Sequence, residues 1–298
     1  MPCYRCSSFS NTLEKFLRLF DMAEALRIEN LNFSIYENVR TPAAKGGVIS
    51  KVFGNIFRSS SLTHRQILKD INMSLHPGET VCIGGPSGQG KSLLLRLIAG
   101  LEKPDSGSLF YFGEYIPREK HSALQIALRQ VGLVLQNGAL ISNLTVRDNV
   151  ALPLRYHRRG SEKEIAEKVG MALDLMRVSS VASNFPHTLS AGMLKRVAIA
   201  RSWVMDPKLL LMDEPTAGLD NYNRRNLLPL IDNMRSLFQT TIVIVTHDLR
   251  MADELDSNLI FLHDKTLTEP HSFDYWMQSK EVFAVQLFRD LQKRDGLY

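Results

Sequence analysis

Short apolar runs along the chain predict most of its strands. Residues 26–36 alternate apolar and polar positions, as a half-buried strand does, and residues 67–75 repeat the alternation. Residues 80–83 form a short, mostly apolar run directly after a Pro-Gly turn. Residues 209–212 and 241–245 are apolar throughout apart from Thr241, which predicts strands in a parallel sheet that is covered on both faces.

The same pattern predicts two further strands and one early helix. Residues 109–112 predict an edge strand, and residues 131–135 predict a buried strand that ends at Gln136. Residues 91–99 are leucine-rich and predict a helix directly after a glycine-rich turn.

Helical periodicity dominates the middle of the chain. It covers much of residues 137–205, most clearly at 162–176, and predicts a helical subdomain inserted into an α/β core. A final amphipathic helix is predicted over residues 279–293, with Ser279 as its N-cap.

Residues 37–66 interrupt the strand pattern near the start of the chain. Within them, apolar residues recur at helical spacing over 48–57 and face a polar arc, which predicts an amphipathic helix. Gly54 weakens this helix by ~1 kcal/mol relative to Ala. Two interpretations stay open: the helix packs on its own domain, or it docks on a membrane or a partner.

Composition restricts the classes of protein to which the chain can belong. The chain has 298 residues, of which 44% are hydrophobic, and this is enough for a sizeable globular core. Its net charge of +5 is scattered without a long Lys/Arg tract, so nucleic acid is not an expected partner. No apolar run reaches the ~18 residues that span a bilayer, so a soluble or peripheral protein is expected.

The cysteines and the N-terminal segment add two expectations. Cys3 and Cys6 form a lone C-x-x-C without the second pair that a zinc site needs, and Cys82 lies in a predicted strand, so free thiols in a reducing compartment are expected. Residues 1–21 lack the apolar core of a secretory signal. They are interpreted as an extension or a misassigned start, with a short amphipathic helix over 11–20.

Residues 85–92 match the P-loop pattern G-x-x-x-x-G-K-[ST]. Backbone N–H groups of such a turn cradle phosphate oxygens, and the helix that follows points its positive end at the same site. Lys91 is placed to reach the outer phosphates and Ser92 to ligate Mg²⁺. A plain glycine-rich turn is the alternative, but the flanking strand and helix favour a phosphate site. The predicted nucleotide-binding residues are Gly85, Pro86, Ser87, Gly88, Gln89, Gly90, Lys91 and Ser92.

Two carboxylates follow the apolar run at 209–212. Asp213 is suited to hold Mg²⁺, directly or through water. Glu214 lies one residue further on and can accept a proton from an attacking water. A solvated acidic turn is the alternative, and the presence of a P-loop disfavours it.

Four further segments make the pattern specific. The sequence Leu-Ser-Ala-Gly-Met at 189–193 opens a predicted helix, Gln136 ends a strand, Asp220 follows Ala-Gly-Leu, and His247 follows the last apolar strand. In this order, over residues 26–265, the chain resembles the ATP-binding-cassette (ABC) ATPases, whose signature reads LSGGQ. The resemblance implies an α/β P-loop NTPase (RecA-like) core with an antiparallel β subdomain and an inserted helical subdomain.

The resemblance also implies the activity and the roles of individual residues. ATP and Mg²⁺ are the implied cofactors, and ATP hydrolysis is the implied reaction. Gln136 takes the place of the Q-loop glutamine, and His247 that of the switch histidine, which orients the attacking water. Tyr36 is the best candidate to stack on adenine, because a rigid aromatic face binds a base without hydrogen bonds, and Phe33 is the second candidate. The implied catalytic residues are Glu214, His247 and Gln136, and the implied metal-binding residues are Ser92, Gln136 and Asp213.

The signature segment implies a homodimer. The signature residues are Ser190, Ala191, Gly192 and Met193. Ser190 and the backbone of Gly192 lie at a helix N-terminus, which is an anion site. In the ABC family this site closes over the γ-phosphate of the nucleotide held by the other subunit, with the D-loop, here Asp220, beside it. Ala191 replaces the first signature glycine, so retained but slowed hydrolysis is expected. Asn221 stands where the family usually has proline, at little expected cost.

Within the ABC family, residues 136–155 resemble the Q-loop region of the maintenance-of-lipid-asymmetry (Mla) ATPases, and Met193 agrees with them. This resemblance implies phospholipid transport with an integral-membrane permease and an MCE-domain protein. It also implies a peripheral position on the cytoplasmic face of the inner or plasma membrane. By contrast, the insertion at 37–66 resembles that of polysaccharide-exporting cassettes.

Other classes of ABC protein stay open. Lipoprotein-release, cell-division and solute-import cassettes are the nearest alternatives. A DNA-repair, chromosome or ribosome-associated ABC ATPase is disfavoured, because those proteins carry long coiled coils, zinc insertions or two fused cassettes. The expected organisation is an N-terminal extension (1–25), an ABC ATPase domain (26–265, with its helical subdomain at about 137–205) and a C-terminal helical extension (266–298).

Overall fold

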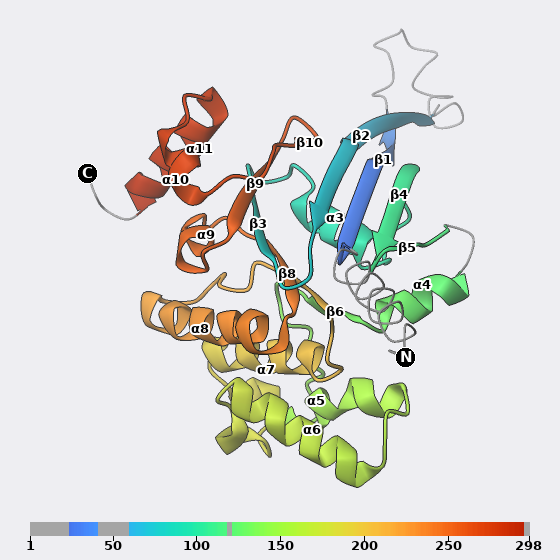
Figure 1. The fold of residues 1–298 in the computed structure, drawn as a ribbon, viewed down its shortest axis with the longest axis vertical. Helices are drawn as coiled ribbons and strands as arrows, with labels where there is room; N and C mark the ends of the chain where they lie inside the picture. The colour runs from blue at the N-terminus through green and yellow to red at the C-terminus, as the bar shows by residue number, and fades with distance from the viewer. Residues whose placement is uncertain (1–23, 41–59, 118–120, 295–298) are drawn as a thin grey trace, which may run out of the picture.

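The computed structural model describes residues 24–40, 60–117 and 121–294, which form two sheets and a set of helices around them (Figure 1). The strands are β1 (Leu26–Arg40), β2 (Ser60–Leu75), β3 (Thr80–Gly84), β4 (Ser106–Tyr111), β5 (Glu114–Tyr115), β6 (Val131–Val134), β7 (Leu209–Asp213), β8 (Thr241–Val245), β9 (Asn258–His263) and β10 (Thr266–Leu267). The α-helices are α3 (Lys91–Ile98), α4 (His121–Leu128), α5 (Val146–Tyr156), α6 (Glu162–Leu175), α7 (Ala191–Trp203), α8 (Asn221–Phe238), α9 (Arg250–Glu254), α10 (Phe273–Gln278) and α11 (Val282–Arg294). Two short 3₁₀ helices, η1 (Ser179–Val181) and η2 (Pro186–Thr188), lie between α6 and α7.

The central sheet has six strands in the order β10-β9-β3-β8-β7-β6. Strands β9, β3, β8, β7 and β6 run parallel to their neighbours, and only the two-residue β10 is antiparallel. Every residue of β3, β7 and β8 is buried, which confirms the prediction of parallel strands covered on both faces. The predicted α/β P-loop NTPase fold is therefore confirmed.

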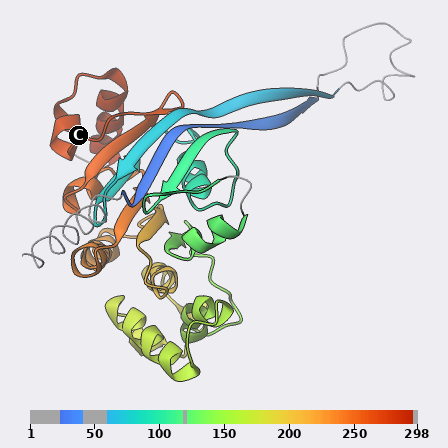
Figure 2. The ribbon, with the colours of Figure 1, turned by 45° about the vertical axis from the view of Figure 1, so that its right-hand side comes forward.

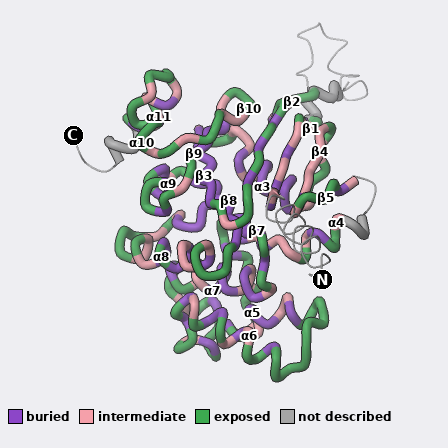
Figure 3. The backbone as a smooth tube through the Cα atoms, viewed as in Figure 1, coloured by how far each residue is buried: buried purple, intermediate pink, exposed green. Residues whose placement is uncertain are grey.

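Side chains of the central strands alternate between two separate hydrophobic cores. Leu209 and Leu211 join a core with the antiparallel sheet and α3, whereas Leu210 and Met212 join a core with α5 to α8. The same alternation holds along β3, β8 and β9. The buried strands form the centre of the molecule in Figure 3, where helices or the second sheet cover both faces.

The second sheet is antiparallel and has the order β2-β1-β4-β5. Strands β1 and β2 are longer than predicted, because residues 37–40 pair with residues 60–63 in an extended hairpin that projects from the body of the protein (Figure 2). Residues 37–66 were predicted to interrupt the strands, and the bounds of this interruption were wrong at both ends. Backbone pairing continues on each side through a polar sequence. The helix predicted at 48–57 lies outside the described residues.

Three smaller predictions were also wrong. Strand β4 is not at the edge of its sheet, because β5 pairs with its outer side. Strand β6 was expected to be buried, but it forms one edge of the central sheet and is only half buried. Ser279 does not begin the last helix: it ends α10, its hydroxyl accepts a hydrogen bond from the Glu281 N–H (3.2 Å), and α11 begins at Val282.

Helices α5, α6 and α7 follow β6 and precede β7, in the region where helical periodicity was predicted. Their N-termini have side-chain caps, which satisfy backbone N–H groups that have no partner inside the helix. Thr145 caps α5, and Ser161 and Glu164 form a capping box on α6. Below the sheet in Figure 1, these helices form a separate layer from the antiparallel sheet.

The sequence also set expectations for membrane spans, metal-binding clusters and cysteines. Among the described residues, no helix is long and apolar enough to cross a membrane. The same residues contain no cluster of His, Cys, Asp or Glu suited to a metal ion by itself. Cys82 is a free, fully buried thiol, and burial raises its pKa to about 12. Cys3, Cys6 and the helix predicted at 11–20 lie outside the described residues.

Candidate functional site

The glycine-rich turn at 85–90 joins β3 to α3 at the centre of the parallel sheet. Gly85 and Gly90 have positive φ angles of 133° and 101°. A Cβ on Gly85 would lie 2.4 Å from the Leu262 carbonyl oxygen, and a Cβ on Gly90 would lie 2.7 Å from the Ile67 side chain. Only glycine combines these positive φ angles with the lack of a Cβ that these close contacts require. The turn can therefore pack closely between β9 and β2.

Lys91 and Ser92 begin α3 and point back into the site. The Lys91 ammonium is buried and donates to the carbonyl oxygens of Gly85 (2.8 Å) and Pro86 (2.9 Å). Burial lowers the pKa of Lys91, while the charges of Glu214 and Asp213 act in the opposite direction. The Ser92 hydroxyl donates to Asp213 Oδ1 at 2.9 Å. The structure thus places the Lys-Ser pair of the P-loop against the carboxylate at the end of β7.

Ser92 and Asp213 offer a hydroxyl and a carboxylate oxygen side by side. These are hard oxygen ligands of the kind that Mg²⁺ accepts when substrate phosphates supply other positions. One hydroxyl and one carboxylate leave most positions around such a metal to other ligands, so this donor set fits a metal that arrives with a nucleotide.

Glu214 follows Asp213 in an unusual backbone conformation, with φ 48°. Its N–H donates to the Val245 carbonyl (2.9 Å), and its own carbonyl accepts from the Ala217 N–H (3.1 Å). The side chain is buried, and Oε1 has no hydrogen-bond partner among the described residues. Burial raises the pKa of Glu214, while a hydrogen bond from the His247 backbone and the Lys91 charge lower it. A buried carboxylate with one oxygen that accepts no hydrogen bond is suited to accept a proton.

His247 follows β8 and lies beside Glu214. The distance from His247 Nε2 to Glu214 Oε1 is 3.5 Å. Gln136 lies two residues beyond the end of β6 and lines, together with Glu214 and His247, a cavity of about 410 Å³. All three predicted catalytic residues therefore lie at the carboxyl ends of adjacent parallel strands, where α/β sheets bind ligands.

The signature segment and the predicted D-loop lie next to each other. Ser190 caps α7 and accepts a hydrogen bond from the Met193 N–H at 3.3 Å, so the helix begins as predicted. Asp220 caps α8 by accepting from the Asn223 N–H at 2.7 Å. A Cβ on Gly192 would lie 2.7 Å from Asn223 Oδ1, so these two helix starts are in close contact. Ala191 is the first residue of α7 and is exposed.

The aromatic candidates differ in exposure. Tyr36 is 67% exposed on the β1–β2 hairpin, and its ring is 5.2 Å from that of His64. Phe33 is partly buried and packs against the core shared with α3. No described contact brings Tyr36 to the P-loop, although Ile67 of the same hairpin touches Gly90. Tyr36 therefore has the available ring face, and its role stays a prediction.

Lys195 and Arg224 also lie at the site, although the sequence motifs did not point to them. Lys195 of α7 is buried and donates to the carbonyl oxygens of Gln136 and of Glu214 (3.0 Å). Arg224 of α8 forms ion pairs with Asp248 and with Glu254 (2.7 Å) and lines the same cavity as His247. A basic residue one turn into the signature helix was the only signal in the sequence for Lys195.

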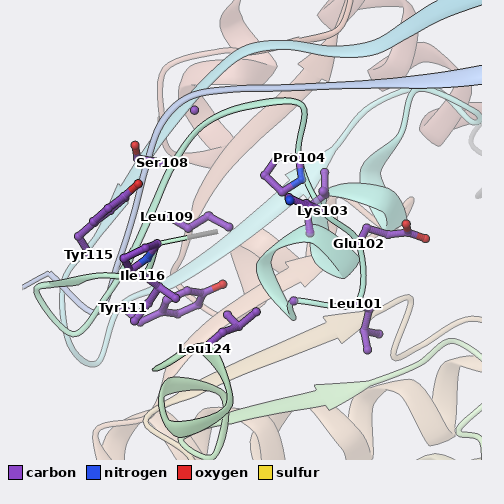
Figure 4. Close-up of a pocket in the computed structure, with 14 residues that line it drawn as sticks. Leu101, Glu102, Lys103, Pro104, Ser108, Leu109, Tyr111, Tyr115, Ile116 and Leu124 are labelled. Atoms are coloured by element: carbon purple, nitrogen blue, oxygen red, sulfur yellow. The ribbon is translucent and has the colours of Figure 1, made fainter. Parts of the chain in front are cut away.

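A second cavity, of about 260 Å³, lies away from these residues, and none of residues 85–92 lines it. In Figure 4, Tyr111, Ile116 and Leu124 lie on one side of it and Lys103 and Pro104 on the other. The Tyr111 hydroxyl is already bonded to the Ile98 carbonyl, so it is not free for a ligand. This cavity contributes nothing to the chemistry at Glu214.

The parallel sheet, the P-loop after β3 and the Ser92–Asp213 pair define a P-loop nucleotide-binding protein. The family model described as "ABC transporter" matches residues 68–217. The chain belongs to this family and is an ATP-binding, ATP-hydrolysing cassette.

Two relatives illustrate the range of the family. The sulfate/thiosulfate import ATP-binding protein CysA of Halalkalibacterium halodurans is 38% identical over 83% of this chain and 67% of its own length. The lipoprotein-releasing system ATP-binding protein LolD 1 of Chlorobium chlorochromatii is 39% identical over 63% of this chain and 76% of its own. The chain spans 57–67% of the length of three CysA relatives that it matches.

Solved structures with the same fold include two ABC cassettes. The ATP-binding cassette MJ0796, in a dimeric post-hydrolysis state bound to ADP and Pi, has a TM-score of 0.68 and 28% identity, covering 83% of this chain and 98% of its own. CbiO1 of Clostridium perfringens, part of the cbiONQ transporter complex, has a TM-score of 0.70 and 27% identity, covering 91% and 96%.

Proposed function

We propose that this chain is the ATPase subunit of an ABC transporter and that it hydrolyses Mg-ATP as a homodimer to drive a separate integral-membrane permease. The observation that carries the proposal is the Ser92–Asp213 hydrogen bond beside a buried Glu214, whose Oε1 has no hydrogen-bond partner among the described residues and lies 3.5 Å from His247 Nε2. This is an arrangement for holding a phosphate-bound metal and for accepting a proton close to it.

The P-loop residues bind the phosphates of ATP in this proposal. The backbone N–H groups of residues 85–90 surround the phosphate oxygens, and Lys91 exchanges its two carbonyl partners for the outer phosphates. Ser92, Asp213 and Gln136 hold Mg²⁺, directly or through water. Bound Mg²⁺ would neutralise charge that develops on the transferred phosphoryl group. Tyr36 stacks on the adenine base.

Glu214 accepts the proton of the attacking water in this proposal, and His247 orients that water. Burial supports the role of Glu214, because a carboxylate removed from solvent is a stronger base than an exposed one. Glu214 Oε1 lies 3.5 Å from His247 Nε2, and both side chains line the same cavity, where the water would bind.

The homodimer follows from the placement of the signature. Ser190, Gly192 and Met193 form the positive end of α7 and would face the γ-phosphate on the partner chain's P-loop. The dimeric MJ0796 cassette supports this arrangement. In the cell the permease would hold the dimer at the cytoplasmic face of the membrane.

For the cargo we propose phospholipid, moved between envelope membranes with an MCE-domain protein. The support is the sequence of residues 136–155 together with Met193, which resembles that of the Mla ATPases. A second candidate is import of a small solute, which the similarity to the CysA relative favours. The two candidates share the ATPase mechanism and differ in the permease.

The experiment is purification of the tagged chain from membranes in mild detergent, followed by identification of the copurifying proteins. Copurification of a permease with an MCE-domain protein would support phospholipid transport. A permease with a periplasmic solute-binding protein would overturn that cargo and support the second candidate. A Lys91→Ala variant should lose ATP turnover in either complex and should fail to restore transport in a deletion strain.

A further inference from the structure

Helix α7 holds the loops that follow two adjacent strands of the central sheet. Lys195, one turn into the helix, donates to the carbonyl oxygens of Gln136, which lies just beyond β6, and of Glu214, which follows β7. A single buried ammonium thus bonds two of the three predicted catalytic residues through their backbones.

Two further residues of α7 extend this attachment. Arg201 donates to the Gly138 and Ala139 carbonyl oxygens, each at 2.7 Å. The Ser202 hydroxyl donates to the Leu133 carbonyl at 2.7 Å. The signature helix therefore holds the end of β6 and residues 136–139 of the loop that follows, whereas among these three residues Lys195 alone holds the Glu214 turn.

The environment of Lys195 indicates a function beyond packing. Its side chain is buried, and burial lowers the pKa of Lys195, an effect that the nearby charges of Glu214 and Asp213 oppose. Burying a cation costs free energy that an apolar side chain of equal length would not cost. In return, the buried ammonium fixes the position of Glu214, because the Glu214 carbonyl accepts a hydrogen bond from Lys195. Glu214 has a φ of 48°, which non-glycine residues rarely adopt.

We propose that Lys195 is a positioning residue that couples the signature helix to the catalytic carboxylate of its own subunit. A shift of α7, whose N-terminus carries Ser190, is transmitted through the ammonium to the Glu214 backbone and so changes the aim of its carboxylate. The Gln136 carbonyl, held by the same ammonium, moves with it. This inference rests on the proposed role of Glu214 as the base.

The first test uses the nucleotide-free protein and needs no turnover. Lys195→Met keeps the length of the side chain but removes all its donors, and Lys163→Met, at an exposed position of α6, is the matched control. Hydrogen–deuterium exchange should rise at residues 136–139 and 214–217 in Lys195→Met and stay at the wild-type level in the control. Unchanged exchange at 214–217 would overturn the proposal.

The second test separates positioning from binding. Lys195→Met should lower kcat for ATP by about 10- to 100-fold, the size of effect that a misplaced reacting group produces, with KM changed by less than about threefold. Lys195→Gln restores a neutral donor and should recover part of kcat. If both variants are equally slow, or if KM rises as much as kcat falls, Lys195 does not act by positioning.

A double variant distinguishes this inference from the assignment of the base. In a Glu214→Gln background, Lys195→Met should lower the residual single-turnover rate no further, because residues that act as one unit are not additive. An equal additional loss would show that Lys195 acts independently and would overturn the inference. Wild-type turnover by Glu214→Gln alone would instead overturn the role of Glu214. Should Lys195→Met fail to fold, Lys195→Leu, which also lacks a donor, carries the exchange measurement with the same criteria.

Discussion

At the scale of single residues, the conformation of Glu214 is the most informative feature of the site. Left-handed backbone angles at a non-glycine residue cost about 1–3 kcal/mol and persist where the surroundings impose them. At Glu214, the Val245 carbonyl, the Ala217 N–H and the Lys195 ammonium impose the conformation together. The side chain is thereby directed toward His247 and away from solvent.

Glu214→Gln should separate ATP binding from ATP hydrolysis. The amide keeps the size of the side chain but cannot accept a proton, so kcat should fall at least about 100-fold, within the range attributed to general-base catalysis. ATP binding should remain, because Lys91 and the P-loop backbone are unchanged, and closed dimers should accumulate in gel filtration with Mg-ATP. Turnover at the wild-type rate would contradict the role of Glu214 as the base.

The sequence predicted the identity of these residues better than their environment. The P-loop pattern fixes Lys91 and Ser92 because phosphate binding needs those residue types at that spacing. Asp213 and Glu214 follow from the end of an apolar strand. The contacts of Lys195 could not be predicted, since they join segments 59 and 19 residues apart that meet only when α7 packs on the sheet.

At the scale of elements, Asn149 of α5 organises the segment between β6 and the helical layer. It is fully buried, its Oδ1 accepts from the Ile141 N–H (2.8 Å), and its Nδ2 donates to the carbonyls of Ile141, Leu144 and Thr145 (3.0–3.1 Å). The Asn149 side chain thus supplies hydrogen-bond partners to the backbone of residues 141–145, which does not pair with a strand.

Asn149→Leu should destabilise the protein by about 2–4 kcal/mol, because several backbone groups lose their partners at once. Chemical denaturation monitored by circular dichroism would measure this loss. Asn143→Leu, in the same segment but exposed, is the control and should change the free energy of unfolding by less than about 0.5 kcal/mol. Equal effects of the two substitutions would contradict the role of Asn149.

Asp148, the neighbouring residue in α5, should make stability depend on pH. Hydrogen bonds from Thr145 and Arg155 lower its pKa below the ordinary value of 3.8. A carboxylate whose folded-state pKa is depressed stabilises the fold above the unfolded-state pKa, and this stability is lost as the pH falls through the folded-state value.

Asp148→Asn should therefore cost stability at pH 7, by no more than about 1 kcal/mol because both side chains of the ion pair are more than a third exposed. The difference between variant and wild type should shrink as the pH is lowered toward 3 and in ~1 M salt, which screens exposed charges. Denaturation midpoints at several pH values would measure it. A difference that grows on acidification would contradict this assignment.

The elements that the sequence misplaced share a physical reason. Residues 37–40 and 60–63 carry no alternating pattern, yet they form strands because each supplies the backbone partners of the other. Such pairing depends on the partner strand and not on local periodicity. Serine is a residue type that N-caps favour, but Ser279 does not begin α11. The start of that helix depends on where α10 ends and not on the residue type alone.

At the scale of the whole molecule, residues from distant parts of the sequence meet because the sheet is parallel. The carboxyl ends of β3, β6, β7 and β8, together with the segments that follow them, carry the P-loop, Gln136, Asp213 with Glu214, and His247. All of these lie at the same edge of one sheet. The order of these motifs along the chain was enough to predict this arrangement. The extent of the β1–β2 hairpin and the contacts of α7 were not, because both depend on tertiary packing.

The alternation of side chains between two cores predicts different results for neighbouring residues of β7. Leu210→Ala and Leu211→Ala should each cost about 2–5 kcal/mol, because both leucines are fully buried. Hydrogen exchange in α7 should rise more in Leu210→Ala, and exchange in α3 should rise more in Leu211→Ala, since each leucine packs in a different core. Equal exchange profiles of the two variants would contradict this separation.

This separation has an evolutionary consequence. Odd-numbered positions of β7 support the P-loop helix, which every member of such a family needs in the same form, whereas even-numbered positions support the helical layer. Substitutions can therefore accumulate at every second residue of one strand and reshape the helical layer, while the nucleotide pocket of the same chain keeps its packing. A cassette built in this way can acquire a new membrane partner without a new mechanism of ATP hydrolysis.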